Sequence, residues 1–161
     1  MKTLMAVAAA AGGILLAACS TTPGGALPTE VLFTGQQCKT STPDPSVTLI
    51  EQQAQLDRFY ARLESLGMAP LRAPQLDFVH QRAVLIEMGV RSTGGYGLAL
   101  AAEPAFLRDG KLELHVDWRE PSPGLILTQA LTSPCLLLKV PAGNYRQVTV
   151  LDRQGQVRAG E

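Results

Sequence analysis

The sequence predicts an α+β domain of mainly antiparallel, sandwich-like β-sheet with one N-terminal amphipathic helix, following a cleaved signal peptide. Three observations predict this class. Apolar residues recur at helical spacing between residues 49 and 66. From residue 82 onward the apolar period changes to two, with Gly, Pro, Asn and Asp at the turns between segments. No crossover helix fits between those segments, so the strands are expected to pair antiparallel.

The amphipathic helix is predicted over residues 48–66. Its apolar positions share one face and are Leu49, Leu56, Phe59, Tyr60, Leu63 and Leu66. Thr48 and Glu51 have the spacing of a capping box, in which each side chain bonds the free backbone N–H of the other residue. Gly67 follows at the position where a left-handed residue commonly ends a helix.

The β-sheet is predicted from six segments. They cover residues 31–33, 82–90, 96–101, 111–119, 135–140 and 145–151. The alternation is clearest in 111–119, where Leu112, Leu114, Val116 and Trp118 are expected to point inward and His115 outward. The apolar run at 82–90 predicts a strand buried on both faces.

The N-terminus has the features of a bacterial secretory signal. Lys2 precedes an apolar segment from Leu4 to Ala18, which is shorter than the about 20 residues that a membrane span needs. The segment ends in Leu16-Ala17-Ala18-Cys19, which resembles the bacterial lipobox. The resemblance implies that residues 1–18 are removed as a lipoprotein signal peptide and that Cys19 is lipidated. The alternative is an ordinary secretory signal with a chance cysteine at its end.

The sequence after the cysteine predicts the domain organisation and the location. Residues 19–29 are rich in Ser, Thr, Pro and Gly and predict a lipidated, flexible tether. Residues 30–161 are expected to form a single domain. Several acyl chains, palmitate among them, would hold the protein stably in a membrane. Because Ser20 and not an Asp follows Cys19, analogy with lipoprotein sorting predicts the outer membrane, on its periplasm-facing side.

Composition argues against several classes of function. Lys and Arg number 14 and Asp and Glu number 14, so no charge excess predicts nucleic-acid binding. No His, Cys and Glu cluster predicts a metal site, and we expect no cofactor and no catalytic residue. A hydrolase site around His80 is a minor alternative, because no nucleophile, base and acid can all be named for it.

Two cysteines remain for the exported domain, Cys38 and Cys135. In an oxidising compartment two such thiols are expected to form a disulfide if their Cα atoms approach within about 7 Å. The alternative is two separate buried thiols, since Cys135 begins the apolar run Cys135-Leu136-Leu137-Leu138 and free cysteine packs well in a core.

Two segments are unusual loops. The first contains Thr93, Gly94, Gly95 and Tyr96, and it is either a glycine-rich hairpin turn or a partner-facing loop with Tyr96 as an anchor. The second contains Pro123, Gly124, Thr128, Gln129 and Thr132. Its polar side chains are expected to bond backbone groups of a non-sheet segment, with partner binding as the alternative.

These loops also carry a resemblance to a known family. The segments Met88-Gly89-Val90-Arg91-Ser92-Thr93-Gly94-Gly95-Tyr96, Pro121-Ser122-Pro123-Gly124 and Thr128-Gln129-Ala130-Leu131-Thr132-Ser133-Pro134-Cys135 resemble the C-terminal domain of the PrcB protease-complex-subunit family. The resemblance covers about residues 76–141. It implies a non-catalytic lipoprotein that supports assembly of a protease complex. Cys135 stands where the family pattern leads us to expect an aromatic residue.

The sequence therefore favours an outer-membrane-anchored adaptor or stabilising subunit for a protein partner, which the resemblance implies to belong to a protease complex. The alternative is a peptidase inhibitor, because Thr93-Gly94-Gly95-Tyr96 also resembles a loop of the chagasin-like inhibitors of cysteine peptidases.

Overall fold

The computed structural model describes residues 25–38, 40–65 and 71–160. The expected signal peptide, Cys19 and the expected helix-ending Gly67 lie outside these residues. In the described part of the chain no helix is both long and apolar enough to span a bilayer.

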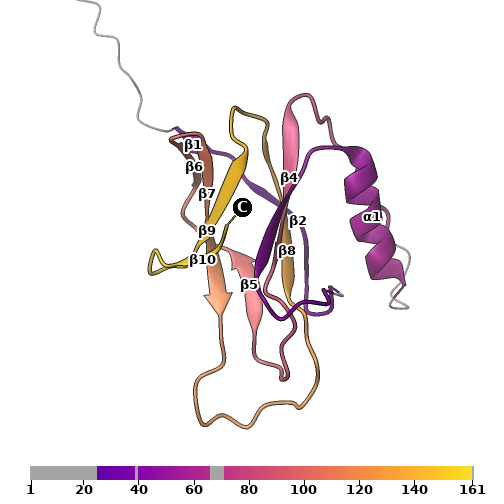
Figure 1. The fold of residues 1–161 in the computed structure, drawn as a ribbon, viewed down its shortest axis with the longest axis vertical. Coiled ribbons are helices and arrows are strands. Elements are labelled where there is room, and N and C mark those ends of the chain that lie inside the picture. The colour runs from indigo at the N-terminus through magenta and orange to yellow at the C-terminus, as the bar shows by residue number, and fades with distance from the viewer. Residues whose placement is uncertain (1–24, 39, 66–70, 161) are drawn as a thin grey trace, which may run out of the picture.

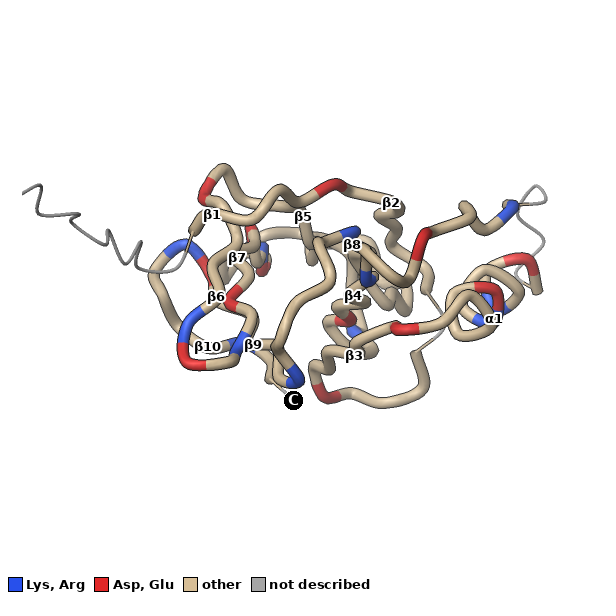
Figure 2. Tube along the Cα trace, turned by 90° about the horizontal axis from the view of Figure 1, so that it is seen from above, with Lys and Arg blue, Asp and Glu red and all other residues tan. Residues whose placement is uncertain are grey.

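The described residues form three layers, which are a helix, a four-stranded sheet and a six-stranded sheet (Figures 1 and 2). The four-stranded sheet has the order β2 (Glu30–Gly35), β8 (Cys135–Pro141), β4 (Gln81–Glu87), β3 (Ser46–Ile50). The six-stranded sheet has the order β1 (Ala26–Leu27), β6 (Ala105–Arg108), β7 (Lys111–Arg119), β9 (Gln147–Leu151), β10 (Val157–Gly160), and β5 (Gly97–Leu100) also pairs with β7. Helix α1 (Gln53–Glu64) covers the outer face of the four-stranded sheet.

The middle layer explains the unbroken apolar runs. On β4, Val84 and Ile86 face the six-stranded sheet, whereas Ala83 and Leu85 face α1. Residues Leu136 to Leu138 of β8 divide between the two cores in the same way. Both strands are therefore buried on both faces, as the sequence predicted for β4.

The six-stranded sheet has one buried face and one solvated face. Leu112, Leu114 and Val116 of β7 are completely buried, while the residues between them are more exposed. Pairing is antiparallel except between β7 and β9, which are parallel. Strands β7 and β9 can pair in parallel because the connection between them passes through β8 in the other sheet, which takes the place of a crossover helix. The expected mainly antiparallel α+β class is confirmed.

The predicted start of the helix and its predicted cap are wrong. Residues Ser46–Ile50 pair with β4 as strand β3, with Thr48 opposite Leu85. The side-chain oxygen of Gln55 accepts the N–H groups of Gln52 and Glu51, at 3.1 and 2.9 Å, so the helix begins at Gln53. Glu51 instead pairs with Arg82, Oε1 to Nε 3.3 Å. Pairing with β4 decides the conformation of Ser46–Ile50, because the apolar residues of this segment fit a strand as well as a helix.

Three short strands were not expected from the sequence. They are β1, β6 and β10, of two, four and four residues. Strand β1 lies within the segment expected to be a tether, and its Ala26 pairs with Phe106 and its Leu27 with Ala105. The chain is thus part of the sheet several residues before residue 30.

Candidate partner-binding surface

Two loops meet at one end of the sandwich, the glycine loop (residues 91–96) and the long loop (residues 120–134). The long loop joins β7 to β8 and extends beyond both sheets at the bottom of Figure 1. Gly95 has a φ of +91°, a region that side chains with a Cβ rarely adopt. A Cβ at Gly95 would lie 3.0 Å from Pro121 Cβ and 3.2 Å from Leu127 Cδ2. Glycine is therefore needed here for both backbone conformation and close packing.

Hydrogen bonds join the two loops. The N–H of Gly94 donates to the carbonyl of Thr128 at 2.9 Å. Arg91 and Thr132 exchange both backbone hydrogen bonds, at 2.8 and 2.9 Å. The Thr132 hydroxyl donates to the carbonyl of Thr93 at 3.1 Å. Residues that the sequence analysis placed in two separate candidate loops thus form one surface.

The other expected residues of the long loop lie nearer its tip. Pro123 and Gly124 form a turn in which Gly124 has a φ of +83° and an open surrounding. The Gln129 side-chain amide donates to the carbonyl of Leu127 at 3.3 Å. Thr132 and Gln129 therefore bond the backbone of non-sheet segments, as the sequence predicted.

Tyr96 is half-buried and packs against the core between the sheets. The Arg91 guanidinium carbon lies 5.6 Å from the centre of the Tyr96 ring. The same guanidinium donates to the carbonyl of Pro43 at 2.8 Å and to that of Met88 at 2.5 Å. Tyr96 and Arg91 together hold the glycine loop in place.

A disulfide between Cys38 and Cys135 holds the C-terminal arm of the long loop. The Cα atoms are 5.9 Å apart and both side chains are completely buried. The Cys38 N–H bonds the carbonyl of Ser133 at 3.0 Å, and the Gln37 side-chain amide donates to the carbonyl of Leu131 at 2.7 Å. The structure thus supports the disulfide over two separate thiols.

The tip of the long loop presents apolar side chains that the sequence analysis did not single out. Leu125, Ile126 and Leu131 are 61%, 104% and 69% exposed. No charged residue occurs between residues 121 and 134. The apolar triplet Leu125-Ile126-Leu127 has no strand alternation and stands between a Pro-Gly turn and a Thr-Gln segment. This pattern is a sequence signal that could have revealed the first two of these residues.

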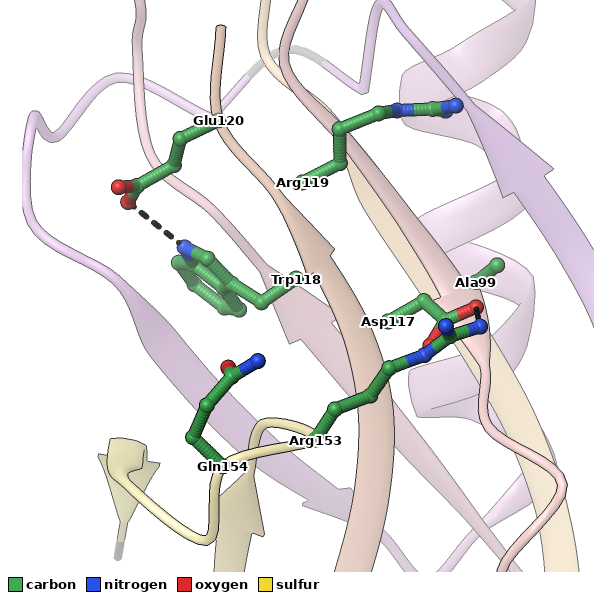
Figure 3. Close-up of a pocket in the computed structure, with 7 residues that line it drawn as sticks. All are labelled: Ala99, Asp117, Trp118, Arg119, Glu120, Arg153 and Gln154. Carbon is green, nitrogen blue, oxygen red and sulfur yellow. Dashed lines mark hydrogen bonds and ion pairs between the residues drawn. The ribbon is translucent and has the colours of Figure 1, made fainter. Parts of the chain in front are cut away.

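A hollow of about 420 Å³ lies beside the end of β7 (Figure 3). It is lined by Ala99, Asp117, Trp118, Arg119, Glu120, Arg153 and Gln154. Two N–H groups of Arg153 donate to Asp117, one of them at 2.6 Å. The Trp118 indole N–H donates to Glu120 at 3.0 Å, and Arg158 contacts both side chains. Both acidic residues of this hollow are thus paired with protein groups.

His80 lies on the surface, away from the two loops. Its Nδ1 is 2.7 Å from Asp77 Oδ2. Hydrogen bonds from His80 and from the Val79 N–H lower the pKa of the Asp77 carboxyl. Among the described residues no group of three or more His, Cys, Asp or Glu is arranged to hold a metal ion.

Comparison with known proteins gives a family match over the segment that contains both loops. Residues 83–141 match the model of the family described as PrcB C-terminal, and this range runs from within β4 to the end of β8 and includes both loops. The match confirms the family resemblance inferred from the sequence for this segment. No curated protein and no solved structure matches the chain.

Proposed function

We propose that this chain is a non-catalytic, lipid-anchored adaptor that binds a protein partner, a component of a protease complex, through the joined loops. The observation that carries the proposal is that the two candidate binding loops are hydrogen-bonded into one exposed surface. The PrcB C-terminal match over the same residues supports a protease-complex partner.

The position of the loops suits this role. Strand β1, where the chain enters the described part, lies at the end of the sandwich opposite to the long loop (Figure 1). With Cys19 lipidated in the periplasm-facing leaflet of the outer membrane, the loops would point away from the anchor. A partner in the periplasm could then reach them.

The test is co-purification from cells that express the tagged full-length protein, after chemical crosslinking. We expect a specific protein partner, which an equally expressed variant carrying Gly95→Val recovers less well. Failure to recover any specific protein would contradict the adaptor role.

A peptidase inhibitor is the second candidate, because the Thr93–Tyr96 loop is at the same end and its Gly95 is exposed. The chagasin-like resemblance concerns only this loop. We expect inhibition of a papain-like peptidase at micromolar protein if this candidate is correct. A panel of such peptidases without inhibition would exclude it.

A further inference from the structure

We infer that the partner site is an uncharged, apolar groove on a second protein, which receives Leu125 and Ile126 from the tip of the long loop. This inference rests on the proposed adaptor function and specifies the chemistry of the partner. It depends on the charge, the exposure and the backbone hydrogen bonding of the tip.

The tip is apolar and lacks charge. Leu127 packs toward Gly95, while the adjacent Leu125 and Ile126 remain exposed at 61% and 104%. Residues 121–134 contain no Asp, Glu, Lys or Arg. A groove that carries unpaired charges would be desolvated without compensation on binding such a tip, so a complementary groove is uncharged.

The loop is also held on both sides of the tip before binding. The Gly94–Thr128 hydrogen bond, the Gln37–Leu131 hydrogen bond and the nearby disulfide hold the C-terminal arm at separate points, and Pro121 of the N-terminal arm packs beside Gly95. A loop held in one conformation loses less entropy on binding than a free one. Two adjacent exposed apolar side chains on such a loop offer apolar area that binding to a partner would bury.

A lipid bilayer fits this tip less well than a protein groove. The backbone N–H groups of Leu125, Ile126 and Leu127 donate no hydrogen bond to any described residue. Such groups are costly to insert into hydrocarbon, whereas a protein groove can accept their hydrogen bonds. Residues 121–134 also lack the Trp, Phe, Lys and Arg that are typical of interfacial membrane segments.

Four pockets of this chain suit the tip less well than an uncharged groove would. The pockets beside Trp118, His80, Phe59 and Tyr145 are each lined by at least two charged side chains. Among these pockets of the described residues there is no uncharged groove that could receive the tip.

The first test places a photo-crosslinking amino acid at Ile126 of the full-length lipoprotein in its own cells. The expected product is an adduct with one different protein, identified by mass spectrometry. An adduct with phospholipid, an adduct with a second copy, or no adduct would each overturn the inference.

The second test measures the affinity of the purified full-length lipoprotein for the purified protein from that adduct. Ile126→Asp should weaken binding at least about tenfold. The control Val157→Asp changes a residue that is similarly apolar and 61% exposed on β10, and should change affinity by less than about twofold. Because Ile126 is fully exposed, Ile126→Asp should melt within about 2 °C of the parent protein, and the affinity of Val157→Asp is measured at a temperature where it is fully folded.

Salt gives an independent readout. Raising NaCl from about 50 to 500 mM should change the dissociation constant less than about twofold, since the tip has no charge to screen. Equal binding by Ile126→Asp, or a large loss of affinity in salt, would overturn the inference while leaving the adaptor role intact. If the tagged protein recovers no partner at all, both proposals fail.

Discussion

Gly95 shows how one residue determines the form of the candidate binding surface. Its positive φ turns the chain within the glycine loop, and its missing Cβ admits Pro121 and Leu127 of the long loop. Gly94 beside it has no positive φ, and a Cβ there would meet Thr128 only at an ordinary 3.7 Å. The two neighbouring glycines therefore have different structural roles.

We predict that Gly95→Val destabilises the domain and Gly94→Ala does not. The β-branched side chain at positive φ should cost at least about 1–2 kcal/mol. At about 4 °C per kcal/mol this lowers the melting temperature by several degrees. Thermal unfolding followed by circular dichroism measures the difference. An unchanged melting temperature for Gly95→Val would show that the loops do not pack as described.

Asp152 organises the turn between β9 and β10. One carboxylate oxygen accepts the N–H groups of Gln154 and Gln156 at 2.9 Å each, and the other accepts from Arg158 at 2.8 Å. Burial opposes ionisation, but these hydrogen bonds outweigh it and lower the pKa of Asp152. The folded state therefore favours the charged carboxylate.

We predict that Asp152→Asn lowers stability by about 1–3 kcal/mol at neutral pH. A carboxyl whose pKa is lowered by folding stabilises the protein above its unfolded pKa of about 3.9, and this contribution is lost as pH falls through the folded pKa. The stability difference between parent and variant should thus shrink below about pH 4. Urea unfolding at several pH values measures it, and a difference independent of pH would contradict the assignment.

At the residue scale the sequence identified the glycine loop and the cysteine pair but missed Leu125 and Ile126. Glycine clusters and cysteines are informative because few residues can replace them. The apolar triplet at residues 125–127 is a weaker signal, since it would also fit a buried strand. Only the fold shows that it extends beyond the sheets.

At the element scale, prediction was correct where the pattern had one explanation. Alternation in β7 and the apolar run in β4 each predicted a strand. Residues 48–50 are predicted as helix because Leu49 is in phase with Leu56, and only the pairing of Ser46–Ile50 with β4 shows that they belong to a strand. Strands β1, β6 and β10 are too short to show a period, so their pairing depends on long-range contacts.

The Cys38–Cys135 disulfide connects two elements, because it ties the segment after β2 to the end of the long loop. It joins the residues following β2 to the start of β8, across 97 positions of sequence. The intact oxidised protein should be two hydrogens lighter than the dithiol, with no free thiol under denaturing conditions at this pair. Reduction should cost about 2–5 kcal/mol.

Hydrogen exchange can locate this effect. Cys38 and Gln37 bond the Ser133 and Leu131 carbonyls, so exchange after reduction should rise first in residues 36–38 and 131–134. Exchange in β7 should change least, because its residues lie in the other sheet. Two alkylatable thiols at Cys38 and Cys135 in protein purified from the periplasm without reductant would contradict the pairing.

At the scale of the whole molecule, the proposed lipid anchor would lie at one end of the sandwich and the candidate binding surface at the other. Strand β1 and the long loop lie at opposite ends of the sandwich (Figure 1). The lipobox-like segment precedes β1 in sequence. This arrangement would hold the loops toward the periplasm.

We predict that Cys19→Ala leaves an uncleaved precursor that is not labelled by palmitate and leaves the outer-membrane fraction. The reason is that the thiol of Cys19 is the expected attachment point of the lipid. Ser20→Asp is the control, and should keep the label but move the protein to the inner membrane. Retained palmitate labelling in Cys19→Ala would contradict the anchor.

The most direct measurement of the central claim is site-specific photo-crosslinking of the full-length lipoprotein in cells at four exposed positions. Ser92 and Gln129 lie in the two loops, whereas Arg58 lies on α1 and Gln154 in the turn before β10. Partner binding through the joined loops predicts adducts with the same protein from Ser92 and Gln129 and none from Arg58 or Gln154. Adducts from Arg58 or Gln154 alone, or from none of the four, would contradict it.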